Sequence, residues 1–182
     1  LPQQGVLSNA FTFVTDITPT ILSFAGVQPP DGRYGGRPVE VMIGRDLTPV
    51  LVGNAERVYG ANDAVGYELA GNSALFQGDY KIVVNRKPLG DGEWRLFNIK
   101  KDPGETRDLA QEEPARLQQM LSAYERYQRE NKVLEMPPGY GHIKQLLINT
   151  LHQQWRTPLL VGLLTLLILL PFLVAYLLRR KP

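Results

Sequence analysis

One apolar run constrains this chain more than any other feature of its sequence. Pro158–Leu178 holds 21 residues without a charge, and a helix needs about 20 residues to cross the hydrocarbon core of a bilayer. Trp155 and Tyr176 stand near the two ends of the run, where aromatic side chains are enriched in membrane helices. Pro171 lies inside it, and a membrane helix tolerates a proline with a kink. We therefore predict a single transmembrane helix at residues 157–178, with the lipid bilayer as a partner.

The charges that flank this run predict its orientation. Three basic residues fill the tail at 179–182, whereas only Lys144 and Arg156 precede the run closely. Cationic flanks favour the cytoplasmic side of a membrane. We expect a basic cytoplasmic tail, with residues 1–156 on the periplasmic or extracytoplasmic side. The basic tail also argues against a glycolipid-anchor signal, which ends in its apolar segment.

A second apolar pattern precedes the span, at residues 141–156. Its apolar side chains share one helical face, and they are Ile143, Leu146, Leu147, Leu151 and Trp155. We predict a juxtamembrane amphipathic helix. His142 and His152 flank this face, but a metal site would need further ligands, so we interpret both as interfacial or solvated.

The totals exclude several classes of protein. The 182 residues contain no Cys, so disulfides and thiolate chemistry are absent. The net charge of +2 comes from the tail, because residues 1–156 carry 17 Lys and Arg against 18 Asp and Glu. No basic patch with interleaved aromatic residues is present, so we expect no nucleic-acid partner. The chain starts at Leu1 rather than Met, which we interpret as processing or a fragment.

The first third of the chain predicts a short strand–helix unit and loops. Phe11–Thr15 is aromatic and β-branched, which favours a strand. Thr18 and Pro19 predict the start of a helix that ends at Gly26. Residues 28–38 predict a surface loop. Further candidates are a helical turn with Leu47, Val50 and Leu51 turned inward, and a strand at Val58–Ala61.

The middle of the chain predicts an antiparallel sheet of three or four strands with one helix. Ala74–Gln77 and Tyr80–Val84 flank Gly78-Asp79, a hairpin signal. A polar loop, Asn85–Glu93, leads to the strand Trp94–Ile99, and Asp102-Pro103-Gly104-Glu105 is typical of a turn, in which Gly104 tolerates positive φ. Pro114–Asn131 shows helical periodicity, and its apolar stripe comprises Leu117, Met120, Leu121, Tyr124 and Tyr127.

Four segments resemble the sulfatase family, in particular the arylsulfatases. They are VTDITPTILSFAGV at 14–27, GRDLTPVLVG at 44–53, GYELAGNSALFQGDYK at 66–81 and GEWRLFNIKKDPGETRDLA at 92–110. The resemblance covers about residues 5–135 and is to the last third of the enzyme. It implies an α/β, alkaline-phosphatase-like sulfatase fold, of which this chain is the C-terminal part: a small antiparallel sheet packed on a helix, followed by one transmembrane helix.

The resemblance also divides the chain. Residues 1–53 correspond to the last βα unit and loop of the large sulfatase domain, and 54–140 to a C-terminal subdomain of antiparallel sheet and helix. The juxtamembrane helix at 141–156, the span at 157–178 and the tail at 179–182 follow.

The catalytic chemistry of the family is not visible in this sequence. Sulfatases use a formylglycine made from Cys or Ser in a C/S-x-P-x-R motif, and a divalent cation, usually Ca²⁺. The chain has no Cys, and none of its serines begins such a motif. We therefore predict no catalytic or metal-binding residue here, and we expect Ca²⁺ and formylglycine in an N-terminal part. Asn62-Asp63 offers oxygen ligands, but its context differs from the family's metal pair and favours a turn.

Two polar segments are candidates for the edge of a substrate cleft: Gly66–Asn72 and Asn85–Glu93. The candidate residues are Glu68, Asn72, Asn85 and Arg86. The resemblance implies the C-terminal portion of a membrane-anchored, bacterial-type arylsulfatase, a sulfuric ester hydrolase that acts on a sulfate ester. The chain alone is expected to be inactive. Two alternatives stay open: a non-catalytic membrane-tethered module, and a phosphodiesterase or phosphonate hydrolase of the same superfamily.

Overall fold

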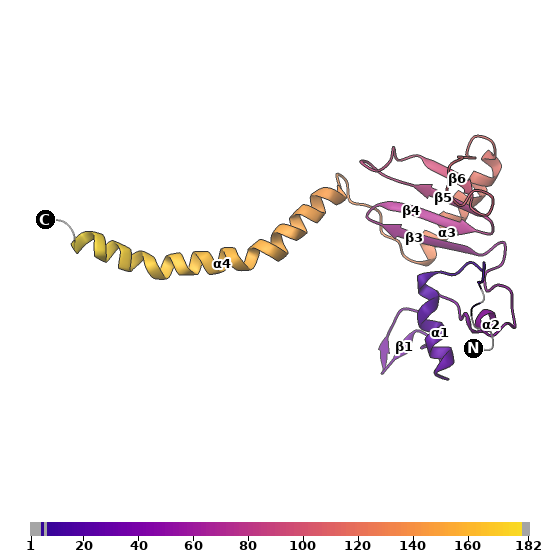
Figure 1. Ribbon diagram of the computed structural model, residues 1–182, viewed down its shortest axis with the longest axis horizontal. Coiled ribbons are helices and arrows are strands. Elements are labelled where there is room, and N and C mark those ends of the chain that lie inside the picture. Colours follow the sequence, from indigo (N-terminus) through magenta and orange to yellow (C-terminus); the bar gives the residue numbers. More distant parts are fainter. Residues whose placement is uncertain (1–4, 6, 180–182) are drawn as a thin grey trace.

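A four-stranded antiparallel sheet organises the globular part of the chain (Figure 1). The computed structural model describes residue 5 and residues 7–179. The strands are β3 (Ala64–Leu69), β4 (Asn72–Gln77), β5 (Tyr80–Val84) and β6 (Trp94–Asn98), and they pair in chain order. One helix, α3 (Pro114–Glu130), packs on the sheet, and the long helix α4 (His142–Arg179) leads away from it. The predicted fold class, a small antiparallel sheet on a helix followed by a long apolar helix, is confirmed.

Two tight turns set the register of the first three strands. Gln77 pairs with Tyr80 around Gly78-Asp79, as the sequence predicts, and Gly78 has φ +58°. Leu69 pairs with Asn72 around Ala70 and Gly71, whose φ angles are +52° and +83°. Two successive residues with positive φ match the hairpin turn whose twist suits flanking strands. This second hairpin adds β3, a strand that the sequence did not predict.

The segment after β6 turns back along that strand. Asp102 accepts hydrogen bonds from the backbone N of Thr106 at 2.7 Å and of Arg107 at 2.9 Å. The positive φ in this turn belongs to Glu105, at +54°, rather than to Gly104, the residue that tolerates it most easily. Glu105 is held there because its carboxylate pairs with Lys81 Nζ on β5 at 2.6 Å.

The core lies between the sheet and α3. Its centre consists of Leu75, Ile82, Leu96, Met120, Ala123 and Tyr124. The predicted stripe of α3 therefore faces the sheet, although Leu117, Leu121 and Tyr127 are only partly buried. Gly66 on β3 makes room for α3, since a Cβ there would lie 2.6 Å from Cε1 of Tyr127.

The opposite face of the sheet receives aromatic side chains from the start of the chain. Ala74, Val83 and Phe97 form a second, smaller buried cluster on this face. The ring of Phe13 lies 6.2 Å from Tyr67 and that of Phe11 5.1 Å from Phe76. The N-terminal segment thus covers part of the sheet through its phenylalanines.

The predicted strand at Phe11–Thr15 was wrong. A 3₁₀ turn, η1 (Val14–Asp16), leads directly into α1 (Ile17–Phe24), two residues before the predicted start. A strand needs a neighbour to receive its backbone hydrogen bonds, and no described strand lies alongside this segment. Instead, the N–H of Phe13 donates to the Asp16 carboxylate at 2.7 Å and closes the turn. Gly26 follows α1 with φ +68°, as predicted for a helix end.

Three further differences concern exposed segments. Residues 28–38 were predicted as a loop, but they contain a short hairpin. Its strands, β1 (Arg33–Tyr34) and β2 (Arg37–Pro38), have two residues each. The helical turn α2 (Thr48–Leu51) exists, but Leu51 is 39% exposed and does not point inward. The predicted strand at Val58–Ala61 was wrong. The carbonyl of Val58 accepts a hydrogen bond from Arg45 instead, and the Tyr59 hydroxyl donates to Asp16.

The juxtamembrane segment and the apolar run form a single helix. α4 is 38 residues long and contains Pro158 and Pro171. Residues 143–179 are long and apolar enough to cross a membrane, and none of the most apolar window is buried. The basic residues at 180–181 lie outside the described residues.

Candidate functional site

The predicted cleft-edge residues gather where β3, β4 and β5 meet the loop Asn85–Glu93. Asn72 Oδ1 accepts the backbone N–H of Arg86 at 2.8 Å, and Arg86 Nε donates to the carbonyl of Gly71 at 2.9 Å. The β3–β4 turn and the end of β5 are therefore fastened together. Asn85 contributes through its backbone, because its carbonyl accepts the N–H of Gly92 at 3.0 Å and closes the loop.

Glu68 is the chemical centre of this edge. Its carboxylate accepts a hydrogen bond from the Ser73 hydroxyl at 2.5 Å on Oε2 and another from the Tyr124 hydroxyl on Oε1. Burial, followed by the hydrogen bond to Glu68, raises the pKa of Tyr124 to about 12. A carboxylate that receives two hydroxyl donors is well satisfied. Its arrangement suits positioning of β3 against α3 better than proton transfer.

A shallow hollow of about 680 Å³ lies beside this cluster. Glu68, Ser73, Arg86 and Tyr124 line one side of it, and the segment that leads from α3 towards α4 lines the other with Met136 and Tyr140. The structure thus brings Glu68 and Arg86 to one surface. Asn72 and Asn85 lie next to that surface but do not line it.

Sequence reasoning missed Ser73 and Tyr124 as partners of Glu68. The signal for Ser73 was the turn at Ala70-Gly71, because it places residues 68 and 73 directly opposite each other. Tyr124 belonged to the predicted apolar stripe, and helical periodicity alone does not reveal that its hydroxyl meets a carboxylate. Both require the register of β3, which was not predicted.

A second polar cluster joins the N-terminal segments to the sheet layer. Asp16 is fully buried, and its Oδ1 accepts the backbone N–H of Arg45 at 2.8 Å. Tyr59 donates its hydroxyl to the same oxygen at 2.5 Å. The Arg45 guanidinium lies 4.6 Å from the centre of the Tyr59 ring. Burial, followed by the hydrogen bond to Asp16, raises the pKa of Tyr59.

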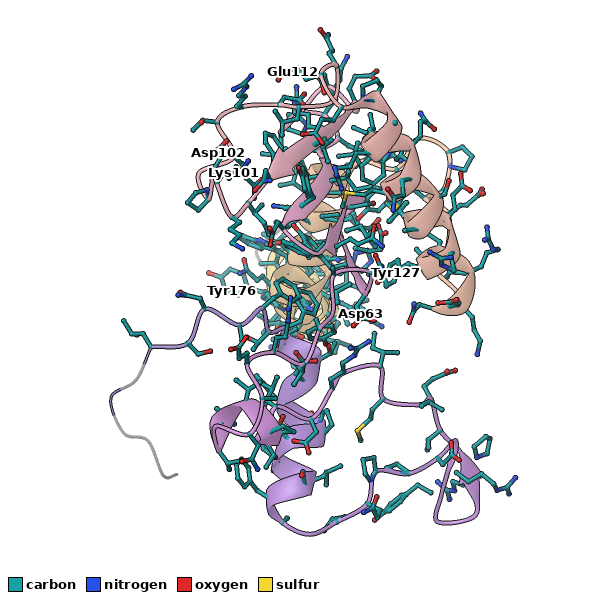
Figure 2. All side chains as sticks on the ribbon, turned by 90° about the vertical axis from the view of Figure 1, so that its right-hand side faces the viewer. Asp63, Lys101, Asp102, Glu112, Tyr127 and Tyr176 are labelled. Carbon is teal, nitrogen blue, oxygen red and sulfur yellow. The ribbon has the colours of Figure 1, made fainter. Side chains whose placement is uncertain are left out.

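Asp63 completes this cluster and lies in a turn, as predicted. Its Oδ2 accepts the N–H of Gly60 and the Nη1 of Arg45, both at 2.6 Å. The hydrogen bond from Arg45 is the main reason that the pKa of Asp63 is lowered. Figure 2 shows Asp63 between the N-terminal segments below and the sheet layer above. The cluster is therefore a structural joint rather than a ligand site.

The described part of the chain does not fit a metal centre. Between residue 7 and residue 179, no group of three or more His, Cys, Asp or Glu side chains could hold a metal ion. His152 is exposed on α4, with Nδ1 at 3.1 Å from the carbonyl of Ile148. The structure therefore supports no chemical step through Ca²⁺ on these residues.

Comparison with known proteins extends the resemblance seen in the motifs. No protein-family model matches the sequence. An uncharacterized sulfatase of Schizosaccharomyces pombe is 31% identical over 140 residues, which make up 77% of this chain and 25% of that protein. The chain thus spans about a quarter of the length of the curated relative that it matches.

One solved structure shares the fold over part of its length. The crystal structure of Ps i-CgsB in complex with k-i-k-neocarrahexaose superposes with a TM-score of 0.50 and 22% identity, covering 79% of this chain and 29% of that one. A 2-O GAG sulfatase gives a TM-score of 0.46 at 23% identity, with 65% and 25% of the two chains covered. In its motifs and in its identity to the yeast protein, the chain is similar to the C-terminal part of sulfatases.

Proposed function

We propose that this chain is the C-terminal portion of a membrane-anchored arylsulfatase, a sulfuric ester hydrolase. The observation that carries the proposal is the 31% identity to a sulfatase over 140 residues. In this proposal the catalytic groups, formylglycine and Ca²⁺, lie in a preceding part. The present chain contributes the antiparallel subdomain and the anchor, on the domain boundaries given above.

An exposed apolar face on α1 supports the proposal that this chain packs against a further domain. Val14, Ile17, Ile21 and Phe24 follow helical spacing, and each is at least half exposed. Apolar side chains that line one stripe of a helix normally pack against another layer. In a whole sulfatase that layer would be the large domain, to which the resemblance assigns residues 1–53.

The cleft-edge residues differ in the hydrogen-bonding groups that remain free to contact a substrate. Glu68 is already engaged by Ser73 and Tyr124. Arg86 is exposed, and the described hydrogen bonds of its side chain involve Nε alone. A guanidinium presents further N–H donors in a planar fork that suits oxyanions. We therefore assign sulfate-ester contact to Arg86, and a supporting role to Glu68, Asn72 and Asn85.

The decisive experiment uses the complete reading frame from which this chain comes. It is expressed with a formylglycine-generating enzyme and assayed on an aryl sulfate. We expect a C/S-x-P-x-R motif upstream of Leu1, with turnover that disappears when its Cys or Ser is changed to Ala. The present chain alone should show no turnover above a blank, because the covalent step lacks an acceptor.

The alternatives give different results in the same assay. A start codon directly before Leu1 would favour the non-catalytic membrane-tethered module. Faster hydrolysis of an aryl phosphodiester or phosphonate than of the aryl sulfate would favour the related phosphoesterases. Either result would overturn the proposed arylsulfatase.

A further inference from the structure

The helix α4 is longer than a membrane is thick. Its 38 residues extend over about 57 Å at 1.5 Å per residue, whereas the hydrocarbon core measures about 30 Å. If the uncharged run Pro158–Leu178 occupies that core, residues 142–157 stand outside it. The inference below therefore rests on the proposed membrane anchor and asks what covers this outer part.

The outer part has one apolar ridge. Ile143, Leu147, Leu151 and Trp155 recur every four residues and are 51–58% exposed. Residues four apart lie on the same side of a helix, one above the other. Polar side chains occupy the other side, where Gln145 Nε2 donates to Asn149 Oδ1 at 3.0 Å. The ridge runs into the apolar run without a break in the helix.

The body of the protein does not cover this ridge. Figure 1 shows α4 leading away from the sheet, and the side chains of the ridge keep about half of their surface exposed. Whatever covers the ridge must therefore come from outside the described part of the chain.

The charge of this region indicates the occupant. After Glu135 the sequence contains no Asp or Glu, whereas Lys144 and Arg156 lie within the outer part of α4. Lys and Arg side chains can bury their stems against apolar surface while their charged ends reach the headgroups. An apolar ridge accompanied by two basic residues and no acidic residue matches an anionic lipid surface.

A proline stands where the helix would have to turn. Pro158 has no N–H, so the carbonyl of Gln154 lacks its helical donor and the helix is weakened there. Figure 1 shows α4 bowed, with its first part oblique to its second. Proline is the usual cause of a sharp bend in a helix.

We propose that residues 142–157 form an interfacial helix that lies on the surface of an anionic bilayer, which residues 158–178 cross. Ile143, Leu147, Leu151 and Trp155 enter the boundary between headgroups and acyl chains, and Lys144 and Arg156 contact lipid phosphates. The hinge at Pro158 converts one continuous helix into a span and a surface arm. The arm holds the globular body close to the lipid instead of about 24 Å above it, which is the rise of 16 helical residues.

Spin labelling tests this arrangement directly, because the chain has no Cys. Single variants Leu147→Cys and Leu151→Cys report the ridge, and Gln145→Cys and Asn149→Cys are matched controls on the polar side. Each full chain is reconstituted in vesicles of phosphatidylcholine and phosphatidylglycerol, and collision rates with oxygen and with a water-soluble nickel chelate are compared. We expect an oxygen-to-nickel ratio several-fold higher at the two ridge positions than at the two controls.

A fifth variant, Leu164→Cys, separates failure of the arm from failure of the anchor. A lipid-buried label at 164 with water-exposed labels at 147 and 151 would overturn the surface arm and leave the anchor standing. A water-exposed label at 164 would overturn the anchor itself. Labels at 147 and 151 that are shielded from both reagents and broaden each other between chains would show that a second copy covers the ridge, which also overturns the proposal.

The anionic preference has its own test. In phosphatidylcholine vesicles, or after Lys144→Gln with Arg156→Gln, the labels at 147 and 151 should become shallower. The neutral change Gln145→Asn, on the polar side, should leave their depth unchanged. Equal depth in both lipid mixtures and in the charge variant would overturn the role of anionic lipid.

Discussion

The Asp16 carboxylate accepts a hydrogen bond from the hydroxyl of Tyr59, 43 residues away in the sequence, at 2.5 Å. The same carboxylate, fully buried, also receives the backbone N–H groups of Phe13 and Arg45. A buried charge is tolerated when its hydrogen-bonding capacity is filled in this way. Asp16 therefore ties together three segments of the chain, around Phe13, Arg45 and Tyr59.

Replacement of Asp16 by Asn should loosen this joint. The carboxylate accepts hydrogen bonds from N–H and O–H groups on both of its oxygens, whereas the amide of Asn would present an NH₂ donor in place of one oxygen. A lost hydrogen bond to a charged group costs about 1.5–3 kcal/mol. We expect faster amide hydrogen exchange across residues 10–50, measured by mass spectrometry on the full chain in detergent. The matched control is Asp31→Asn on the exposed loop, which should leave that exchange unchanged. Equal exchange in both variants would mean that the joint does not depend on this carboxylate.

Replacement of Gly66 by Ala should destabilise the sheet against α3. The new Cβ would lie 2.6 Å from Cε1 of Tyr127, closer than Cβ atoms come to their neighbours in folded proteins, and such overpacking typically costs about 1–3 kcal/mol. Urea melts followed by Trp94 fluorescence, in a Trp155→Phe background, measure the free energy of unfolding.

The smaller side chain of Tyr127→Leu should rescue Gly66→Ala in a double-mutant cycle, because it removes the ring that the Cβ meets. Gly104→Ala is the control, since its Cβ would find only ordinary contacts, at 3.5 Å and beyond. Additive effects of the two core changes would contradict the assigned contact.

Tyr124 should make stability fall at high pH. Burial raises its folded pKa to about 12, whereas a free tyrosine has a pKa of about 10. The folded chain therefore keeps this proton at pH values where the unfolded chain has lost it. The contribution is complete below about pH 10 and is lost as the pH rises towards 12. Urea midpoints between pH 9 and 12 should decline less steeply in Tyr124→Phe than in the unchanged chain. Parallel declines would show that Tyr124 does not hold its proton in this way.

Local signals predicted the centre of the fold but not its edges. The β4–β5 hairpin and α3 carry their own turn and periodicity signals, so they could be located without knowledge of the rest. β3 was missed because Ala64–Leu69 contains Gly66 and lacks a clean alternation, and its structure depends on pairing with β4. Phe11–Thr15 has the composition of a strand, but η1 and the Asp16 carboxylate determine its course.

The candidate site shows the same division. Glu68 and Arg86 could be proposed from their segments, whereas Ser73 and Tyr124 depend on a register and on a helix orientation that only the packed structure supplies. The joint around Asp16 was missed entirely, because its partners lie 29 and 43 residues further along the chain. Sequence distance of this size leaves no local pattern.

The last prediction concerns the side of the membrane on which the body lies. The tail carries three basic residues at 179–181, and only Lys144 and Arg156 precede the span within the outer part of α4. Because the denser cationic cluster favours the cytoplasm, we expect residues 1–156 outside it. Single Cys residues can be placed at Ser122, which is exposed on α3, and at Pro182. An impermeant thiol reagent should label Ser122→Cys on intact cells and reach Pro182→Cys only after lysis. The chain without Cys is the blank. Labelling of Pro182→Cys alone on intact cells would place the body in the cytoplasm and remove the case for an exported sulfatase.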